Sequence, residues 1–224
     1  MVLGGLALAT QGSRSFNPDF LSLIVNDSAN PILNNIDVMN FHNYGDKTAL
    51  KKDMDLVRSL VGSKPVWVTE VGYSSEDNPA NPAYPKNPIL RSTYGVGEDG
   101  QAKYLSGILP YIVGELGAEK AFWYTLYDMP DDKPGTFCKH GLLYIQGQQC
   151  LGAGAPFPTS ANFIAKKALS AYSSLTGGTS SAVLSPTSVT NAPVTTQKSW
   201  LGKLKLYLGL SKLSLSVAFL RELL

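Results

Sequence analysis

Residues that bind metals are scarce in this sequence. Its 224 residues include two cysteines and two histidines, and these four residues do not form the four-ligand pattern of a structural zinc site. A phosphate-binding loop of the form GxxxxGKS or GxxxxGKT is also absent, which excludes one large class of nucleotide-binding enzymes. The formal net charge is only +2, so no strong electrostatic field favours a nucleic acid as a partner. We therefore expect neither a metal site nor nucleic-acid binding.

Hydrophobic residues make up 44% of the chain, which is enough for one soluble domain with a core. Short apolar runs predict four strands, at residues 2–8, 36–41, 65–70 and 120–128. Helical spacing appears within residues 16–35, at 47–61 before Gly62, at 100–116 with a kink at Pro110, and at 160–175. Residues 74–100 and 129–158 predict loops. Alternating strands and helices predict an α/β fold with parallel strands buried on both faces.

Polar and aromatic side chains gather where the predicted strands end. Glu70 closes the run PVWVTE, His42 and Tyr44 follow the second run in FHNYG, and Trp123 lies in FWYTLYD. A carboxylate beside an aromatic platform suits sugar cleavage, because the ring packs on the C–H face of a pyranose while the carboxylate attacks the anomeric carbon. Other interpretations stay open: Glu70 paired with a Lys or Arg, His42 as a structural histidine, and Trp123 as ordinary core.

The motifs DVMNFHNYG, KPVWVTEVGYSS and KAFWYTLYDMPDDKPGTFCKHGLLY resemble strands six, seven and eight of retaining glycoside hydrolases of the large (β/α)8-barrel clan, and VLGGLA resembles strand five. The resemblance covers residues 1–175 and implies the C-terminal half of a TIM barrel that acts on a β-linked glycan without a cofactor. It implies that Glu70 is the nucleophile and Trp123 the stacking platform. It also implies that Asn40, His42 and Tyr44 line the sugar subsite.

The sequence departs from this clan in one essential feature, because the Asn-Glu pair that carries the acid/base does not occur in the 224 residues. Asp128 and Glu98 are the carboxyl groups considered as substitutes, although no motif supports either. A full barrel takes about 250 residues, so four strands make half of one. We therefore expect a truncated glycosidase with little or no activity alone and with exposed barrel edges that favour self-association. The alternatives are a non-catalytic carbohydrate-binding protein and a structural or adhesive surface protein.

The rest of the chain differs in composition. Residues 176–199 are rich in Ser, Thr and Pro and predict a disordered linker, and residues 200–224 alternate apolar with polar side chains. The alternation in that last segment predicts a strand or hairpin that contacts a membrane surface or a partner. An unstructured end is the alternative, and the lysines argue against a membrane span. Cys138 and Cys150 form a disulfide if the protein is secreted, or else are two free thiols. With the sequon at Asn26, these features favour an extracellular or cell-surface parent protein, although residues 1–13 lack the basic flank of a signal peptide.

Overall fold

The computed structural model describes residues 2, 5, 20–81, 83–128, 138–145 and 163–177. The chain divides into two units, Met1–Leu184 and Ser185–Leu224, and the second lies wholly outside the described residues. The predicted linker at 176–199, apart from Thr176 and Gly177, and the predicted tail at 200–224 therefore lie outside the described residues. All described residues belong to the first unit.

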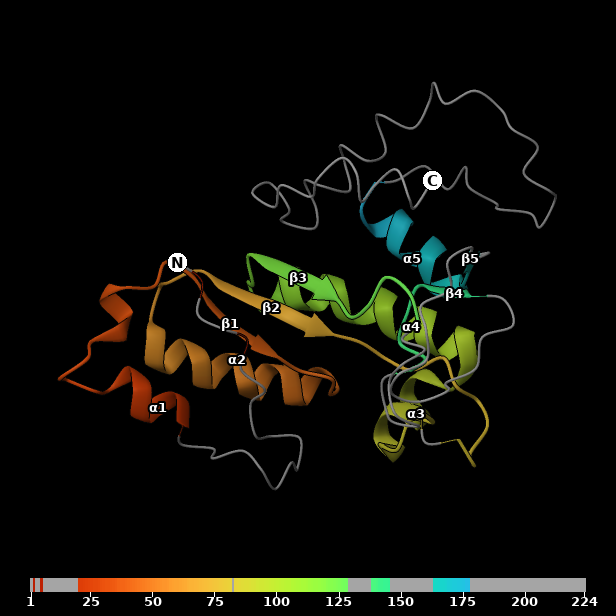
Figure 1. The fold of residues 1–224 in the computed structure, drawn as a ribbon, viewed down its shortest axis with the longest axis horizontal. Coiled ribbons are helices and arrows are strands. Elements are labelled where there is room, and N and C mark those ends of the chain that lie inside the picture. The colour runs from red at the N-terminus through yellow and green to blue at the C-terminus, as the bar shows by residue number, and fades with distance from the viewer. Residues whose placement is uncertain are drawn as a thin grey trace. The chain divides into compact units, whose positions relative to one another are not determined.

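A parallel three-stranded sheet is the centre of the unit, with the strand order β1-β2-β3. Its strands are β1 (Met39–His42), β2 (Val66–Val71) and β3 (Lys120–Trp123), and their arrows point the same way in Figure 1. Helix α2 (Lys47–Val61) connects β1 to β2, and α4 (Gly97–Pro110) precedes β3. This arrangement confirms the predicted α/β class with parallel strands.

Helix α2 shows why the sequence folds as predicted here. The Asp46 side chain caps its N-terminus by accepting a hydrogen bond from the backbone N–H of Ala49 at 2.8 Å. Its buried apolar face follows helical spacing, and Gly62 ends it with a φ of 63°, which favours glycine. The helix thus occupies the predicted residues 47–61, and it holds β1 and β2 side by side with their carboxyl ends at the same edge.

The core lies between one face of the sheet and the helices. The sheet contributes fully buried side chains to this core: Met39, Phe41, Val66, Val68 and Val71. Helices α2 and α4 contribute side chains that are fully or almost fully buried: Leu50, Met54, Val57, Leu105 and Ile108. On the other face, Trp67 and Phe122 stay partly exposed, with ring centroids 5.9 Å apart. The prediction of strands buried on both faces is therefore wrong for β2 and β3, whereas in β1 Asn40, on the same face as Trp67, is only 4% exposed.

The N-terminal run was predicted as a buried strand, and only Val2 and Gly5 of it are described. Val2 forms one isolated parallel bridge with Val38, so the segment starts beside β1 in the predicted direction. Val2 is 43% exposed and Gly5 is exposed as well, so burial is wrong for these two residues. The remainder of residues 2–8 lies outside the described residues.

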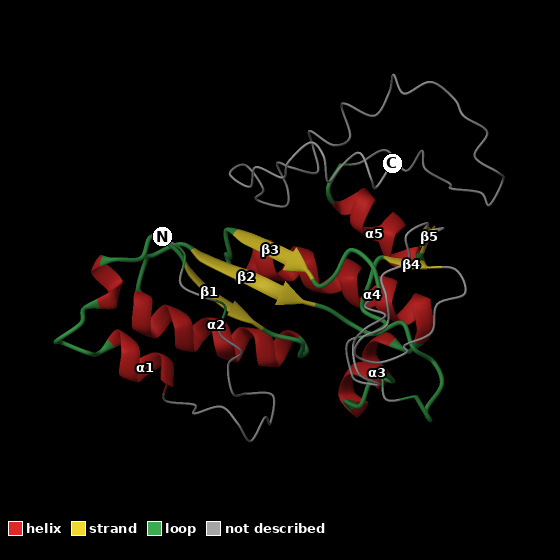
Figure 2. Cartoon of the chain, viewed as in Figure 1, coloured by secondary structure: helices red, strands yellow, loops and turns green. Residues whose placement is uncertain are grey.

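Further elements differ from the prediction or refine it, and Figure 2 shows the chain coloured by secondary structure. Within residues 16–35 the helical part consists of α1 (Phe20–Val25) and the short η2 (Ile32–Asn34). The predicted loop 74–100 contains α3 (Pro88–Tyr94) and the start of α4. The kink predicted at Pro110 is instead the start of a π-helical turn, η3 (Tyr111–Glu115). The predicted loop 129–158 contains β4 (Leu143–Ile145), which pairs antiparallel with β5 (Phe163–Ala165) at the start of the predicted last helix. That helix, α5, spans only Lys167–Leu175.

Candidate functional site

The carboxyl ends of β1 and β2 bring the first candidate residues together. His42 is the register partner of Glu70 in the parallel pair, so their side chains emerge on the same face of the sheet. The loop after β1 then carries Tyr44, and the backbone N–H of Asn43 donates to the carbonyl of Glu70 at 3.0 Å. Adjacent parallel strands thus place three residues from two distant segments at one edge.

A β-bulge in β2 sets the direction of Glu70. Phe41 pairs with Val68 and the next residue, His42, pairs with Glu70, so β2 has one residue more than β1 between these pairs. The pairing with β3 also shows one extra residue in β2. Val68 pairs with Ala121 and Val71 pairs with Trp123, so three steps along β2 match two steps along β3. Strict alternation from the buried Val68 would point Glu70 into the core. The extra residue reverses that phase and puts the carboxylate on the open face.

Two polar groups lie beside one oxygen of Glu70. The phenol Oη of Tyr44 donates to Oε2 at 2.6 Å, and Nδ1 of His42 lies 3.3 Å from the same atom. The side chains of His42 and Glu70 are 21% and 33% exposed, so a ligand can reach them. Among the described residues, Oε1 of Glu70 has no hydrogen-bond partner. The described contacts therefore hold the carboxylate through one oxygen and leave the other without a hydrogen bond.

Burial, and next the hydrogen bond to the Glu70 carboxylate, raise the pKa of the Tyr44 phenol well above its ordinary value. The phenol therefore keeps its proton at neutral pH and acts as a donor. A charge-assisted bond of this length is among the stronger hydrogen bonds that proteins form. The arrangement suits a carboxylate that must stay oriented while it acts as a nucleophile or as an electrostatic partner of a cation.

Trp123 is not brought together with these residues. It pairs in register with Val71, whose side chain is in the core, and its ring packs toward Tyr104 of α4 at 6.2 Å between centroids. Its indole Nε1 donates to the carbonyl of His140 at 3.0 Å. The next residue, Tyr124, is the aromatic side chain that lies beside Tyr44, with ring centroids 6.1 Å apart. Of these two aromatic residues, Tyr124 is therefore the one with a described ring contact to Tyr44, and the role of Trp123 as a platform stays a prediction.

The predicted subsite residues Asn40 and His42 lie on the same face of β1. Asn40 is only 4% exposed and pairs in register with Trp67, so it lies deeper along the strand than His42. Gly5 passes so close to His42 that a Cβ added there would lie 2.0 Å from Nε2. Glycine is required at this contact because any side chain would displace the imidazole.

His140 is a site residue that the sequence interpretation missed. Its side chain is 7% exposed, and its ring forms edge contacts with Tyr44 at 5.9 Å and with Tyr124 at 6.5 Å between centroids. Gly72 fills the space between these groups, since an added Cβ would lie 3.1 Å from Cδ2 of His140 and 3.3 Å from Cε1 of Tyr44. The sequence signal was the motif KHGLL, which carries no periodicity that would place the ring.

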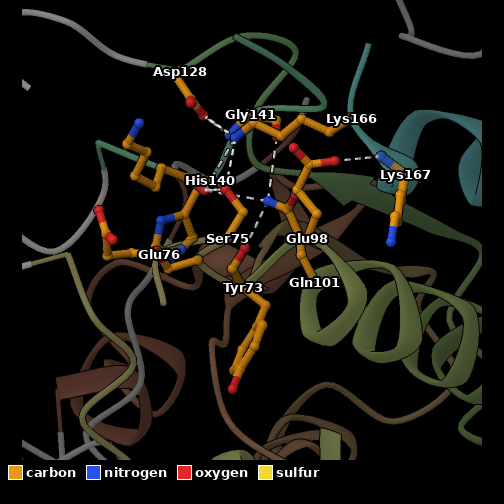
Figure 3. Close-up of polar contacts among 12 residues, drawn as sticks. Tyr73, Ser75, Glu76, Glu98, Gln101, Asp128, His140, Gly141, Lys166 and Lys167 are labelled. Atoms are coloured by element: carbon orange, nitrogen blue, oxygen red, sulfur yellow. Dashed lines mark hydrogen bonds and ion pairs between the residues drawn. The ribbon is translucent and has the colours of Figure 1, made fainter. Parts of the chain in front are cut away.

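Asp128 and Glu98, the carboxyls considered as acid/base substitutes, are held by other partners (Figure 3). Asp128 forms an ion pair with Lys166 at 2.5 Å, with side chains 12% and 2% exposed, and accepts the N–H of Gly141 at 2.9 Å. Burial raises the pKa of Asp128 even though Lys166 opposes this, and burial lowers the pKa of Lys166. Glu98 accepts the N–H of Lys167 at the start of α5. Both carboxyls therefore have structural partners.

The described residues contain no cluster of three or more His, Cys, Asp or Glu that could hold a metal ion. In the same part of the chain, no helix is long and apolar enough to cross a membrane. Cys138 is buried and disulfide-bonded, whereas Cys150 lies outside the described residues. The pairing of these two cysteines stays a prediction.

Residues 6–143, more than half of the chain, match the family model described as "Glycosyl hydrolase catalytic core". This segment contains β1, β2, β3 and the Glu70 site. No curated protein matches the sequence.

Among solved structures, the chain is similar to a β-glucuronidase 2 from Bacteroides uniformis, at 19% identity and a TM-score of 0.35 over 48% of this chain and 13% of that one. It is also similar to the AHE enzyme from Alicyclobacillus herbarius (18% identity, TM-score 0.32, 53% of this chain and 32% of that one). A third similar structure is a β-glucosidase from Exiguobacterium marinum (16% identity, TM-score 0.29, 50% of this chain and 31% of that one). The chain thus spans at most a third of the length of these proteins.

Proposed function

This chain belongs to the glycosyl hydrolase catalytic core family, and we propose that it carries the nucleophile-bearing half of a retaining glycosidase that acts on a β-linked glycan. The observation that carries this proposal is the Glu70 carboxylate, which is oriented through Oε2 by Tyr44 and His42 and has no hydrogen bond from the described residues at Oε1. A nucleophile in a double displacement needs a carboxylate that is held in place while one of its oxygens attacks.

In the proposed reaction, Oε1 of Glu70 attacks the anomeric carbon, and the bond from that carbon to the leaving-group oxygen breaks. A glycosyl ester forms on Glu70, and water later cleaves it and restores the carboxylate. The Tyr44 phenol, which keeps its proton, holds Oε2 throughout and orients the attacking oxygen. His42 borders the same oxygen, Asn40 lies deeper on the same face, and Tyr124 supplies the aromatic surface that was expected of Trp123.

The leaving group of a natural glycan needs a proton, and a retaining enzyme places the donor carboxyl about 5–5.5 Å from the nucleophile. We assign this acid/base to a residue outside these 224 residues, because the sequence has no Asn-Glu pair and Asp128 and Glu98 have other partners. Residues 1–175 would then be strands five to eight of a (β/α)8 barrel. The other half would come from a longer chain, a partner, or a second copy docked on the open edges. The linker 176–199 and the tail 200–224 would follow it in an extracellular or cell-surface protein.

Two β-glycosides that differ in their leaving group test the proposal on the full chain. A 2,4-dinitrophenyl glycoside departs without a proton, whereas a methyl glycoside needs the acid, whose help is worth about 10²–10⁴ in rate. We expect dinitrophenol release that disappears in Glu70→Gln and no detectable cleavage of the methyl glycoside. Release that is equal in Glu70→Gln would contradict the nucleophile assignment.

A carbohydrate-binding protein without catalysis is the second candidate, because Glu70 is the only carboxyl that the described contacts place at the site. It predicts saturable sugar binding by the full chain without any dinitrophenol release. Titrating the full chain with the glycoside and following tryptophan fluorescence measures this binding. The presence or absence of dinitrophenol release then separates the two candidates.

A further inference from the structure

The chain has only two histidines, and both of them lie at the Glu70 site. We propose that His140 is a positioning residue of this site: its ring holds the Tyr44 side chain so that the phenol stays bonded to Glu70. The inference rests on the proposed function of Glu70 only where it says what this positioning does for catalysis. The contacts of His140 with Tyr44 and of Tyr44 with Glu70 are observed independently of any activity.

The first step is the support of the Tyr44 ring. His140 and Tyr124 both meet it edge-on, with interplanar angles of 81° and 82°. Edge-to-face ring pairs stabilise beyond the area that they bury. Gly72 lies against the same ring on the side of β2. The phenol direction therefore depends on neighbours that contact its ring rather than on Glu70 alone.

The second step is the rigidity of His140 itself. Its carbonyl accepts hydrogen bonds from Nε1 of Trp123 at 3.0 Å and from the N–H of Thr125 at 3.4 Å. The carbonyls on either side, those of Lys139 and Gly141, accept from Nε2 of Gln101 at 3.3 and 3.2 Å (Figure 3).

Gln101 is fully buried in α4, and its Nε2 also donates to the carbonyl of Tyr73 at 2.9 Å. Lys166 and Asp128 hold the same segment from the other side, through the Lys139 carbonyl and the Gly141 N–H. Breaking one of these bonds would leave a further buried donor or carbonyl unpaired, which favours the observed arrangement of the segment. The residues that fix His140 therefore also fix the wall of the site, and this gives Trp123 a positioning role in place of the predicted stacking role.

The third step is the electrostatic readout. Tyr44 and His42 share Oε2 of Glu70, so loss of the phenol leaves more negative charge for the imidazole. The titratable groups that face the phenol are Glu70, His140, Tyr124 and Tyr104. With the phenol gone, the imidazole of His42 is the one described polar group left beside Oε2, so the nitrogen-15 signals of this ring should shift.

Nitrogen-15 NMR of the two histidine rings in the full chain measures that shift directly. We expect His140→Ala to shift the His42 signals in the same direction as Tyr44→Phe. The double variant should show no further shift, because both changes act through the same phenol. His140→Phe, which keeps a flat ring, should leave the His42 signals close to their native positions.

Phe163→Ala is the matched control. Phe163 lies in β5, and the change removes its ring contact with Tyr127, whose ring centroid is 6.3 Å away. It should leave the His42 signals unchanged, which separates a local effect from general loosening of the fold. A folded His140→Ala protein whose His42 signals coincide with those of the control would overturn the inference, as would additivity in the double variant. Neither result depends on turnover, so failure here is distinguishable from failure of the proposed glycosidase function.

Discussion

Replacing Lys166 by methionine should lower the free energy of unfolding by about 3–5 kcal/mol, because the Asp128 carboxylate then stays buried without its cation. Lys166 is 2% and Asp128 12% exposed, so water cannot take over the role of the ammonium group. The methionine keeps the apolar stem, and the loss is therefore electrostatic rather than a cavity. Ser75 also loses a donor at 2.9 Å. The magnitude is a large share of the stability of an ordinary domain.

The pH dependence of the loss has a definite sign. Burial already raises the pKa of Asp128 in the native protein, and removal of the cation raises it further. A carboxyl whose folded pKa exceeds its unfolded value of about 3.9 stabilises the fold only at low pH, and this stabilisation is lost as pH rises through the folded pKa. The difference in stability between native and variant protein should thus be small near pH 4 and reach its full size near pH 7.

Urea unfolding of the full chain, followed by tryptophan fluorescence, measures the effect. Lys167→Met is the matched control, because the neighbouring lysine is 61% exposed and its ion pair with Asp99 faces solvent, so little change is expected. Adding Asp128→Asn to Lys166→Met removes the orphaned charge and should restore most of the loss. An equal loss in the two lysine variants, or a loss that does not depend on pH, would refute the reasoning.

Two further predictions concern the walls of the site. Gly5→Ala puts a methyl group 2.0 Å from Nε2 of His42, so the ring must leave its place, and labelling of the nucleophile by a reactive glycoside should slow at least about tenfold. Gly114→Ala, where an added Cβ meets nothing within 4 Å, should leave the labelling rate unchanged and thereby shows that the first effect is local. Tyr124→Ala should weaken sugar binding by about two- to tenfold and change the free energy of unfolding little. Trp123→Ala should lower the free energy of unfolding by about 3–5 kcal/mol, measured with urea, because its ring packs against the core. The reverse pattern would restore Trp123 as the platform.

Local signals were sufficient to predict the central elements. Apolar runs located β1, β2 and β3, and the spacing of α2 together with Gly62 gave its bounds. The signal for α3 was also present, since Asn87 caps the helix and Pro88 begins it, but the surrounding Pro and Asn residues favoured a loop.

Strand phase at the site could not be predicted in the same way. The direction of Glu70 depends on one extra residue in the pairing of β2, which only the neighbouring strands reveal. In the run Phe122-Trp123-Tyr124 every side chain is aromatic, so the sequence does not show which ring faces the core. His140 was missed for a related reason, because its contacts with Tyr44 and Tyr124 join distant segments through a loop.

The most direct test of the central claim is to treat the full chain with 2-deoxy-2-fluoro-β-glycosyl fluorides and read the product by intact mass and peptide mapping. The fluorine at C2 slows hydrolysis of the glycosyl ester, and fluoride leaves without the missing acid. The account predicts one adduct, on the carboxylate of Glu70, that is absent in Glu70→Gln and forms more slowly in Tyr44→Phe. Folded protein that forms no adduct with any of several sugars, or an adduct that persists in Glu70→Gln, would contradict it.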